Sequence, residues 1–318
     1  MSSILLVKTS SLGDVGHNLP VVNDIVRALP GAVVDWVVEE AFADVPRLHA
    51  AVRRVIPVAI RHWRRAPFSA ATRAAFRQFR AVLRETPYDA VVDSQGLLKS
   101  AWIARLANGV RHGLDFPSSR EPLRPFYDRT HAVPWTLHAV DRNRMLASLA
   151  LSYAHGPAID YGIRCRPRPF DWLGEGRFCV LLHGTSARRK LWPEASWAVL
   201  GQECARRGVR CVLPWGSSDE RERSARLAGR IDGAVVPPRL PVGDVAALLA
   251  GASVVVGVDT GLVHLAAALG VPVVGVYCAT DPAATGIRAD TAACNLGGVG
   301  RQPTPDEVRE AVQRLERQ

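Results

Sequence analysis

The sequence contains very little lysine. Only three of its 40 basic residues are lysines, Lys8, Lys99 and Lys190, and all the others are arginines. Against 30 acidic residues the formal net charge is +10, which predicts an anionic partner. A nucleic acid, a membrane surface and a phosphorylated substrate all fit this charge.

Several common signals are also missing. None of the six cysteines forms a C-x-x-C pair, which argues against a zinc ribbon or a disulfide framework and favours a reducing compartment. The N-terminus has only a short apolar run with no charged segment before it, unlike a secretory signal. The longest apolar stretch, 254–277, is interrupted by Asp259, His264 and turn residues, so it predicts strand, helix and strand. We therefore expect a cytoplasmic protein without a membrane span.

Short β-branched runs alternate with segments of helical periodicity along the chain. Buried strands are predicted at 4–7, 33–38, 90–92, 179–182, 209–213, 254–258 and 271–277. Helices are predicted at 20–29, 70–84, 98–106, 195–206, 219–227, 242–249 and 262–269. This alternation is typical of α/β proteins with parallel sheets and crossover helices.

The pattern restarts near residue 178, after a proline- and arginine-rich stretch at 162–172. At 318 residues and 48% hydrophobic content the chain is large enough for two cores. We expect two doubly wound domains, 1–165 and 166–318, with the last helix, 305–317, packing on either of them. In such sheets ligands lie beyond the carboxyl ends of the strands, so the loops that follow strands are the candidate sites.

The loop after the first strand, at 8–20, carries hydroxyls at Ser10 and Ser11, a glycine at Gly13 and a carboxylate at Asp14. It has neither the G-x-G-x-x-G pattern of dinucleotide sites nor the pattern of a P-loop. Asp14 is predicted either to cap a helix or to act as a catalytic base, and spacing alone leaves both open.

Two loops of the second half suit a phosphate group. In 181–197, Thr185, Ser186 and Lys190 offer hydroxyls and positive charge, although a solvated loop with surface arginines is the alternative. In 254–272, a strand is followed by Asp259, Thr260 and Gly261 at the start of an apolar helix, whose free N–H groups and dipole favour an anion. His264, one turn further, is either a second anion contact or a structural histidine, and Asp259 is alternatively a simple cap.

An acidic segment at 213–223 lies between these two loops. Glu220 is placed to accept hydrogen bonds from a ribose, as acidic residues do in nucleotide sites. An exposed acidic first turn of a helix explains the same residues equally well.

The excess of basic residues is greatest in the first half. Within 61–85, seven arginines accompany a single acidic residue, and an apolar stripe runs beside them. Two structures fit: an amphipathic helix lying at an anionic membrane surface, and a helix buried on one side with a solvated arginine face. No zinc-finger or aromatic RNA-binding motif is present, so nucleic acid is not the expected partner.

Eight segments, in order and across both halves, resemble the lipopolysaccharide heptosyltransferases, bacterial glycosyltransferases of the GT-B fold. They are VKTSSLGDV at 7–15, VIPVAIRHWRR at 55–65, VVDSQGLLKSA at 91–101, SREPL at 119–123, KLWPE at 190–194, LPWGSSDERERSARLA at 213–228, VDTGLVHLAAAL at 258–269 and TDP at 280–282. The start KTSSLGD is similar to that of the members that add the first heptose.

This resemblance implies two Rossmann-like domains facing a cleft, the acceptor on the first and the nucleotide sugar on the second. It implies transfer of L-glycero-D-manno-heptose from ADP-heptose to the first Kdo of Kdo2–lipid A, at the inner face of the inner membrane. The donor residues would be Thr185, Ser186, Lys190, Asp259, Thr260, Gly261, Leu262 and His264 around the diphosphate, Glu220 at the ribose and Leu240 near the adenine. The acceptor residues would be Ser10, Ser11, Gly13, Arg61, Arg64, Lys99 and Arg120, with Asp14 as general base.

No D-x-D triplet lies near these loops, so we expect metal-independent inversion, with Lys190 and helix N-termini stabilising the leaving group and no further cofactor. The basic first domain would dock on the anionic membrane surface. Heptosyltransferase II, another GT-B enzyme and a non-catalytic module that binds a nucleotide sugar or phospholipid are the alternatives.

Overall fold

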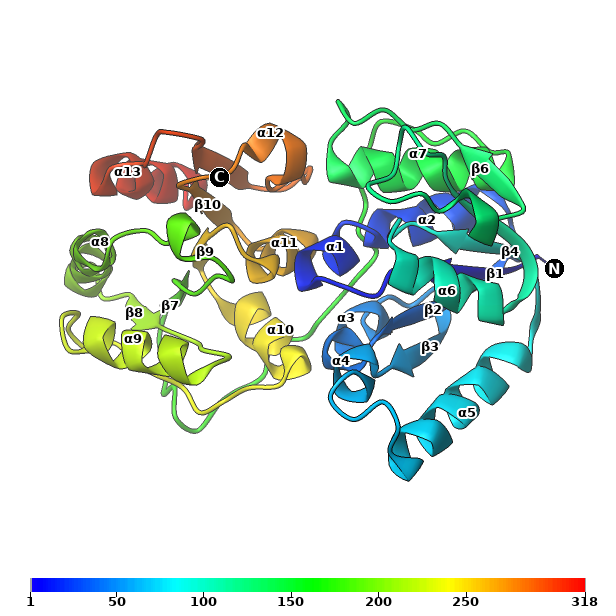
Figure 1. The fold of residues 1–318 in the computed structure, drawn as a ribbon. Helices are drawn as coiled ribbons and strands as arrows, with labels where there is room; N and C mark the ends of the chain where they lie inside the picture. The colour runs from blue at the N-terminus through cyan, green and yellow to red at the C-terminus, as the bar shows by residue number, and fades with distance from the viewer. Residues whose placement is uncertain (1, 318) are drawn as a thin grey trace. The chain divides into compact units, whose positions relative to one another are not determined.

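The computed structural model describes residues 2–317, and the chain divides into two compact units, Met1–Ile163 and Arg164–Gln318. This division falls two residues before the boundary expected from the sequence. Each unit contains one sheet in which every neighbouring pair of strands is parallel (Figure 1).

The sheet of unit 1 has six strands in the order β3-β2-β1-β4-β5-β6. Their bounds are β1 Ser3–Val7, β2 Val33–Glu39, β3 Val52–Val58, β4 Pro87–Asp93, β5 Asn108–Leu114 and β6 Arg129–His131. The strand order reverses between β1 and β4, which is the point where open α/β sheets bind ligands. β1 and the carboxyl-terminal half of β4 are buried, as expected for central strands covered on two faces.

The helices of unit 1 cover both faces of this sheet, with α2 packed on α7 and α5 packed on α6 (Figure 1). Their bounds are α1 Leu12–Gly16, α2 Leu19–Ala28, α3 Asp44–Arg47, α4 Ile60–Trp63, α5 Ala70–Arg84, α6 Leu98–Leu106 and α7 Ala139–Leu151, with 3-10 turns at Glu40–Phe42 and Arg124–Phe126. Leu5, Ile56, Phe79, Leu83 and Ile103 belong to the core between the sheet and the α5–α6 layer.

The sheet of unit 2 has the order β11-β10-β9-β7-β8, and its order reverses between β7 and β9. The strands are β7 Phe178–Leu182, β8 Arg210–Val212, β9 Val254–Val258, β10 Val273–Tyr277 and β11 Ala293–Gly297. The helices are α8 Glu194–Arg206, α9 Ser218–Ala228, α10 Val242–Gly251, α11 Gly261–Ala268, α12 Pro282–Thr285 and α13 Pro305–Leu315, with a 3-10 turn at Arg188–Lys190.

The last helix, α13, packs against α8 and β10 of unit 2. Val308, Ala311, Val312 and Leu315 contribute its buried face to the core of that unit. Of the two positions left open by the sequence, this helix therefore occupies the one on the second unit.

All seven predicted strands and all eight predicted helices are present, and the bounds of α5 and α6 agree with the prediction. The sequence missed β3, β5, β6, β11 and α7, together with the short helices α1, α3, α4 and α12. The missed β5 contains two glycines, and α7 buries Asn143 and Arg144 where an apolar stripe is expected.

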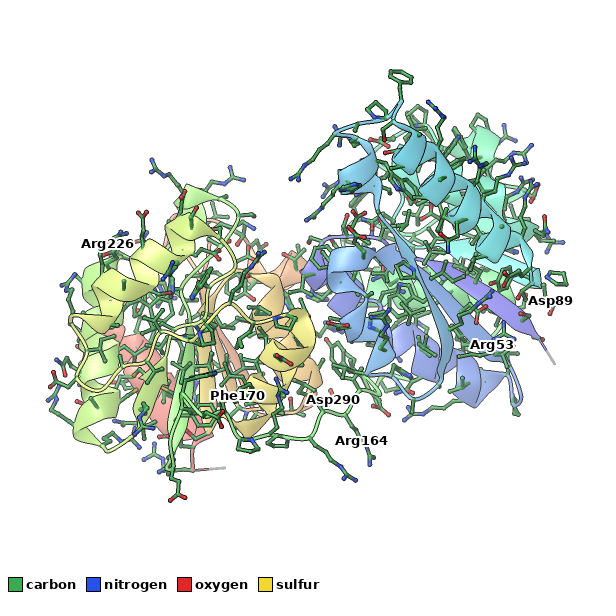
Figure 2. The ribbon with its side chains drawn as sticks, turned by 90° about the horizontal axis from the view of Figure 1, so that it is seen from below. Arg53, Asp89, Arg164, Phe170, Arg226 and Asp290 are labelled. Atoms are coloured by element: carbon green, nitrogen blue, oxygen red, sulfur yellow. The ribbon has the colours of Figure 1, made fainter. Side chains whose placement is uncertain are left out.

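The missed strand β3 lies at the sheet edge, where its proline is tolerated. Its two arginines, Arg53 and Arg54, pair with the fully buried carboxylate of Asp35 on β2 at 2.8 and 3.3 Å. The Arg53 side chain is partly exposed at the surface of the unit (Figure 2). These hydrogen bonds and charges hold the pKa of Asp35 below its ordinary value even though burial raises it.

The arginine-rich helix α5 buries Phe79 and Leu83 in the core of unit 1 and exposes its arginines. The serine before it, Ser69, caps the helix by accepting a hydrogen bond from Thr72 N at 3.1 Å. Most of the apolar stripe is thus used for packing on the sheet, which agrees with a helix buried on one side and solvated on its arginine face. Within residues 2–317 we find no helix with the length and apolarity needed to cross a bilayer.

A buried ion pair joins α7 to α2 in unit 1. Arg144 Nε donates to Asp24 at 2.6 Å, and both side chains are almost inaccessible to solvent. The same guanidinium donates to the carbonyl oxygens of Gly156 and Ala158 at 2.9 and 3.0 Å. Arg144 therefore links α7 to α2 and to the segment at 156–158 that leads to the second unit.

Replacing Arg144 with alanine should lower the free energy of unfolding of unit 1 by about 3–5 kcal/mol, because the Asp24 carboxylate would remain buried without its cation. The matched control is Arg27→Ala, which breaks the exposed pair between Arg27 of the same helix α2 and Asp160 and should cost less than about 1 kcal/mol. Urea denaturation of both variants measures the difference. Equal losses would contradict the importance of the buried pair.

Candidate functional site

The loops that follow β1 and β4 meet where the strand order of unit 1 reverses. Gln95, after β4, accepts hydrogen bonds through its side-chain oxygen from the backbone N–H groups of Thr9 and Ser10, both at 3.0 Å. A single amide side chain thus fixes the path of the loop that carries the candidate base. No local pattern in the sequence indicates this role of Gln95.

Lys8 lies at the end of β1 and is almost completely buried. Its ammonium donates to the carbonyl oxygen of Ser94 at 2.7 Å and to Asn143 Oδ1 at 3.3 Å. Burial lowers the pKa of Lys8, while the carboxylates of Asp14 and Asp93 oppose that shift. Lys8 therefore connects the end of β1 with the loop after β4 and with α7.

Lys99 also connects the loops after β1 and β4, but this lysine lies on the β4 side and reaches the β1 side. It lies in the first turn of α6, after β4, and its Nζ donates to Ser10 Oγ at 2.6 Å. Burial lowers its pKa; Arg61 and Arg64 lower it further, and the carboxylates of Glu39 and Asp14 raise it. Three of the predicted acceptor residues, Ser10, Arg61 and Arg64, thus each interact with a fourth, Lys99.

Asp14 occupies the third position of the short helix α1 and caps it. Its Oδ2 accepts hydrogen bonds from Ser11 N at 2.7 Å and from Ser11 Oγ at 3.0 Å. The capping alternative is therefore realised in the structure. Both bonds end on Oδ2, so the other carboxylate oxygen, Oδ1, is outside the capping contact. Gly13, beside it, is buried within the same helix.

Arg61 and Arg64 lie at the surface in and just after α4. The backbone N–H of Arg61 donates to Glu39 Oε1 at 3.0 Å, and its guanidinium lies over the ring of Phe42 at 5.0 Å. Their side chains are exposed, which suits cations that bind an anion from solution.

Arg120 lies over the ring of Trp135 at 5.8 Å, and a second arginine, Arg142 of α7, lies over the same ring at 3.6 Å. Arg142 donates to the carbonyl oxygen of Ser118 at 2.7 Å, yet its Nη1 is buried with no hydrogen-bond partner within residues 2–317. Burial and the charge of Arg120 lower the pKa of Arg142. The sequence analysis missed Arg142, since α7 itself was not predicted.

In unit 2 the loops after β7 and β9 also meet where the strand order reverses. Thr185 Oγ1 donates to the backbone oxygen of Asp259 at 2.8 Å. The Asp259 carboxylate pairs with Lys190 Nζ at 2.7 Å and accepts from Thr280 Oγ1 at 2.7 Å. The structure thus brings together three predicted donor residues and adds Thr280, which the sequence marks only as part of the segment TDP.

Glu220 lies beside this group. It forms a capping box with Ser217 at the start of α9, and its Oε2 accepts from Gly216 N at 2.7 Å. A Cβ added at Gly184 would lie 2.5 Å from Glu220 Oε1, so the glycine allows the β7 loop to approach this carboxylate. Glu220 is therefore both a helix cap and a neighbour of the Thr185 loop.

The remaining predicted donor residues lie at the start of α11, in the loop after β7 and in the segment before α10. Thr260 precedes α11 in an extended conformation without a side-chain cap, and Gly261 and Leu262 form the first, half-exposed turn. His264 is buried within that helix, and Ser186 is exposed. Leu240 is half-buried in the segment before α10, outside the hydrogen-bonded group around Asp259.

His183 lies beneath the β7 loop, directly before Gly184. Its Nε2 is 2.8 Å from Ser224 Oγ, and the ring is fully buried. Burial lowers its pKa to about 4, from an ordinary value of about 6.5, and the neighbouring arginine Arg223 lowers it further.

The stability of unit 2 should therefore fall in acid. The unfolded chain protonates His183 below about pH 6.5, whereas the folded chain keeps the ring neutral down to about pH 4. The stabilising contribution is complete above pH 6.5 and is lost as the pH falls toward 4, by up to about 3 kcal/mol. Chemical denaturation at pH 7 and pH 4.5 should show a smaller pH dependence for His183→Gln than for the wild type. An unchanged pH dependence in the variant would contradict this assignment.

Known proteins match this chain over most of its length. The family model for glycosyltransferase family 9 (heptosyltransferase) matches residues 76–314. The lipopolysaccharide heptosyltransferase 1 of Pseudomonas aeruginosa is 49% identical over 286 residues, which cover 89% of this chain and 80% of that protein. The chain is a glycosyltransferase, and it belongs to family 9, the heptosyltransferases.

Solved heptosyltransferase structures also resemble this chain. A structure described as E. coli heptosyltransferase WaaC with ADP has a TM-score of 0.89 and 43% identity, covering 98% of this chain and 99% of that one. A second, with ADP-2-deoxy-2-fluoro heptose, has a TM-score of 0.85 at the same identity and coverage. The predicted fold class, GT-B with two parallel-sheet α/β domains, is confirmed.

Proposed function

We propose that this enzyme transfers L-glycero-D-manno-heptose from ADP-heptose to the first Kdo residue of Kdo2–lipid A. The observation that carries the proposal is the sequence identity of 49% with a lipopolysaccharide heptosyltransferase 1, over 286 aligned residues that include both units. The relative crystallised with ADP and with a fluorinated ADP-heptose supports the same donor for this chain.

The donor binds to unit 2 in this proposal. Thr185, Ser186 and Lys190 approach the diphosphate from the β7 side, and Thr260, Gly261 and Leu262 offer the free N–H groups at the start of α11. Asp259 holds Lys190 in position, His264 supports the helix from within, Glu220 binds the ribose, and Leu240 lies toward the adenine.

The acceptor binds to unit 1. Its carboxylates and phosphates require cations, which Lys99, Arg61, Arg64 and Arg120 supply. Arg142 joins them, because its buried, unpartnered Nη1 gains a hydrogen bond when an anion arrives. Ser10, Ser11 and Gly13 shape the loop around the reacting hydroxyl.

The reaction is a single displacement. Oδ1 of Asp14 takes the proton from the acceptor hydroxyl while that oxygen forms a bond to the anomeric carbon and the bond to the ADP oxygen breaks. Attack opposite the leaving group inverts the configuration. Lys190 and the α11 N–H groups stabilise the negative charge that develops on ADP. These groups act in place of the metal that D-x-D motifs hold in other glycosyltransferases.

We place the enzyme on the cytoplasmic side of the inner membrane, held at the anionic surface by the basic first domain. The exposed arginines of α5 support this position. The attraction would be electrostatic, so it weakens as the salt concentration rises.

Incubating the purified enzyme with ADP-heptose and Kdo2–lipid A, with mass spectrometry of the lipid, tests the proposal. A product one heptose heavier is expected with this acceptor, and none with the already heptosylated lipid. Transfer only to the heptosylated lipid would instead identify an enzyme of the second step. Binding of ADP-heptose without transfer to either lipid would indicate a non-catalytic binding protein.

Asp14→Asn separates the base from the helix cap. The amide oxygen of asparagine still accepts the hydrogen bonds from Ser11, so α1 should remain capped, but the side chain cannot take a proton. We expect kcat to fall about 100-fold to 10,000-fold while ADP-heptose binding stays unchanged in calorimetry. Near-normal turnover would show that the carboxylate serves only as a cap.

Lys190→Met removes the cation from the donor loop and should lower kcat at least about 100-fold. Lys190→Arg keeps the charge but places a planar guanidinium between the diphosphate and Asp259, so a loss of about tenfold is expected from misplacement. The exposed exchange Arg206→Lys on α8 is the control. Full activity of Lys190→Arg would show that charge alone is needed here.

A further inference from the structure

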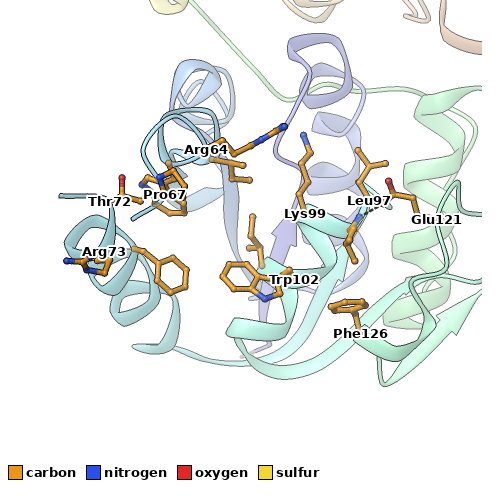
Figure 3. A pocket seen from close by; sticks show the side chains of 14 residues that line it. Arg64, Pro67, Thr72, Arg73, Leu97, Lys99, Trp102, Glu121 and Phe126 are labelled. Carbon is orange, nitrogen blue, oxygen red and sulfur yellow. Dashed lines mark hydrogen bonds between the residues drawn. The ribbon is translucent and has the colours of Figure 1, made fainter. Parts of the chain in front are cut away.

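A large pocket in unit 1 lies between the α4–α5 segment and α6 (Figure 3). Its volume is 880 Å³, within the range of about 300–1,000 Å³ typical of ligand sites. The lining side chains are mostly apolar. They include Ile60, Trp63, Phe76, Leu98, Trp102 and Phe126.

The walls of the pocket expose aromatic surface beside the core of the unit, against which Trp63 and Phe126 also pack. Trp102 is 47% exposed and stacks on Phe76, with ring centroids 5.4 Å apart. Trp63 and Phe76 form an edge-to-face pair with ring centroids 5.8 Å apart. Leu98, one turn before Trp102 on the same face of α6, is also exposed. A contiguous apolar surface of this kind marks a binding site.

The connection between α4 and α5 adds to this surface. Phe68 is 87% exposed, the most exposed of the large apolar side chains in the structure. Its carbonyl oxygen accepts a hydrogen bond from the side chain of Arg73, which lines the pocket. Arg73 therefore links the backbone of the α4–α5 connection to the pocket wall, and the Phe68 ring lies exposed outside the lining.

Two of the three cations in the lining, Arg64 and Lys99, share one end of the pocket, whereas Arg73 lies apart from them (Figure 3). The acidic lining residue Glu121 accepts a hydrogen bond from the backbone N–H of Leu98. The charged groups of Arg64 and Lys99 lie close to each other above the apolar floor, on the opposite side from Phe126 (Figure 3). Lys99 is also the residue that donates to Ser10 in the loop of the candidate base. An occupant must therefore be amphiphilic, with an anionic head toward Lys99 and an apolar tail along Trp102.

We propose that this pocket binds one acyl chain of the anionic glycolipid acceptor. The proposal rests on the proposed function, since it assigns the tail of the same molecule whose head meets Lys99 and Arg64. The complementary charge at one end favours the acceptor over an uncharged apolar ligand. Bulk phospholipid of the membrane is the competing occupant that the test distinguishes.

The test compares two acceptors, Kdo2–lipid A in detergent micelles and its fully deacylated counterpart. Trp102→Gln makes the pocket wall polar without touching the cations. The matched control is Leu149→Gln, which makes the same change at an exposed apolar side chain of α7 in the same unit. Kinetics with both acceptors, ADP-heptose binding and thermal unfolding are measured for each variant.

For Trp102→Gln we expect kcat/KM to fall at least about tenfold with the acylated acceptor, mainly through KM, and to stay unchanged with the deacylated one. Leu149→Gln should leave both unchanged. Equal losses on both acceptors, or no loss on either, would overturn the proposal. Should Trp102→Gln unfold at a lower temperature, Leu98→Gln at the exposed start of α6 provides the same comparison.

A second readout does not depend on turnover. Kdo2–lipid A with a photoreactive acyl chain is cross-linked to the wild-type enzyme, and the labelled peptides are identified by mass spectrometry. Labels within 60–76 and 97–103 support the proposal, and labels elsewhere overturn it. Loss of these labels on adding phosphatidylglycerol vesicles would assign the pocket to bulk phospholipid instead. An enzyme that transfers to neither acceptor but is labelled in these segments would refute the proposed function and leave the acyl site intact.

Discussion

A lysine ammonium bridges the two strand-end loops wherever the strand order of a sheet reverses in this enzyme. In unit 1 Lys8 follows β1 and donates to Ser94 after β4, and in unit 2 Lys190 follows β7 and pairs with Asp259 after β9. Parallel strands on either side of a reversal send their connections to opposite faces, so the two loops separate and leave a crevice. A cation spanning that crevice holds the two loops together and places positive charge at the point where open α/β sheets bind ligands.

The third lysine, Lys99, also spans the reversal between β1 and β4 in unit 1. Lys99 begins on the β4 side and reaches Ser10 on the β1 side, so that all three lysines of an arginine-rich chain lie across a reversal. An ammonium is compact and directs its donors freely, whereas a planar guanidinium requires a wider space and fixed partners. Arginine instead occupies places where a fork is useful, such as Arg144, which binds Asp24 and two carbonyl oxygens at once.

Periodicity was sufficient to predict the strands that border each reversal, because β1, β7 and β9 are apolar runs and the second half of β4 contains a short one at 90–92. It did not reveal β3, whose arginines are neutralised by Asp35 of the neighbouring strand, a partner that is distant in sequence. The same limit applies to the site. Loop position pointed to Asp14, Lys190 and Asp259, but Arg142 depends on a helix with a polar buried face, and Gln95 on a contact between two loops. Such residues act through tertiary partners and leave no local pattern.

The two interpretations of Asp14 are compatible in this geometry. A cap needs one carboxylate oxygen to accept from the backbone, and both Ser11 contacts end on Oδ2. A base needs a second oxygen with free lone pairs in a fixed orientation, and the cap provides that orientation by holding Oδ2 in place. Capping therefore restricts the rotation of the carboxylate and aims Oδ1. Because the Ser11 loop is itself anchored through Gln95 and Lys99, the direction of that oxygen depends on the same contacts that close the crevice between β1 and β4.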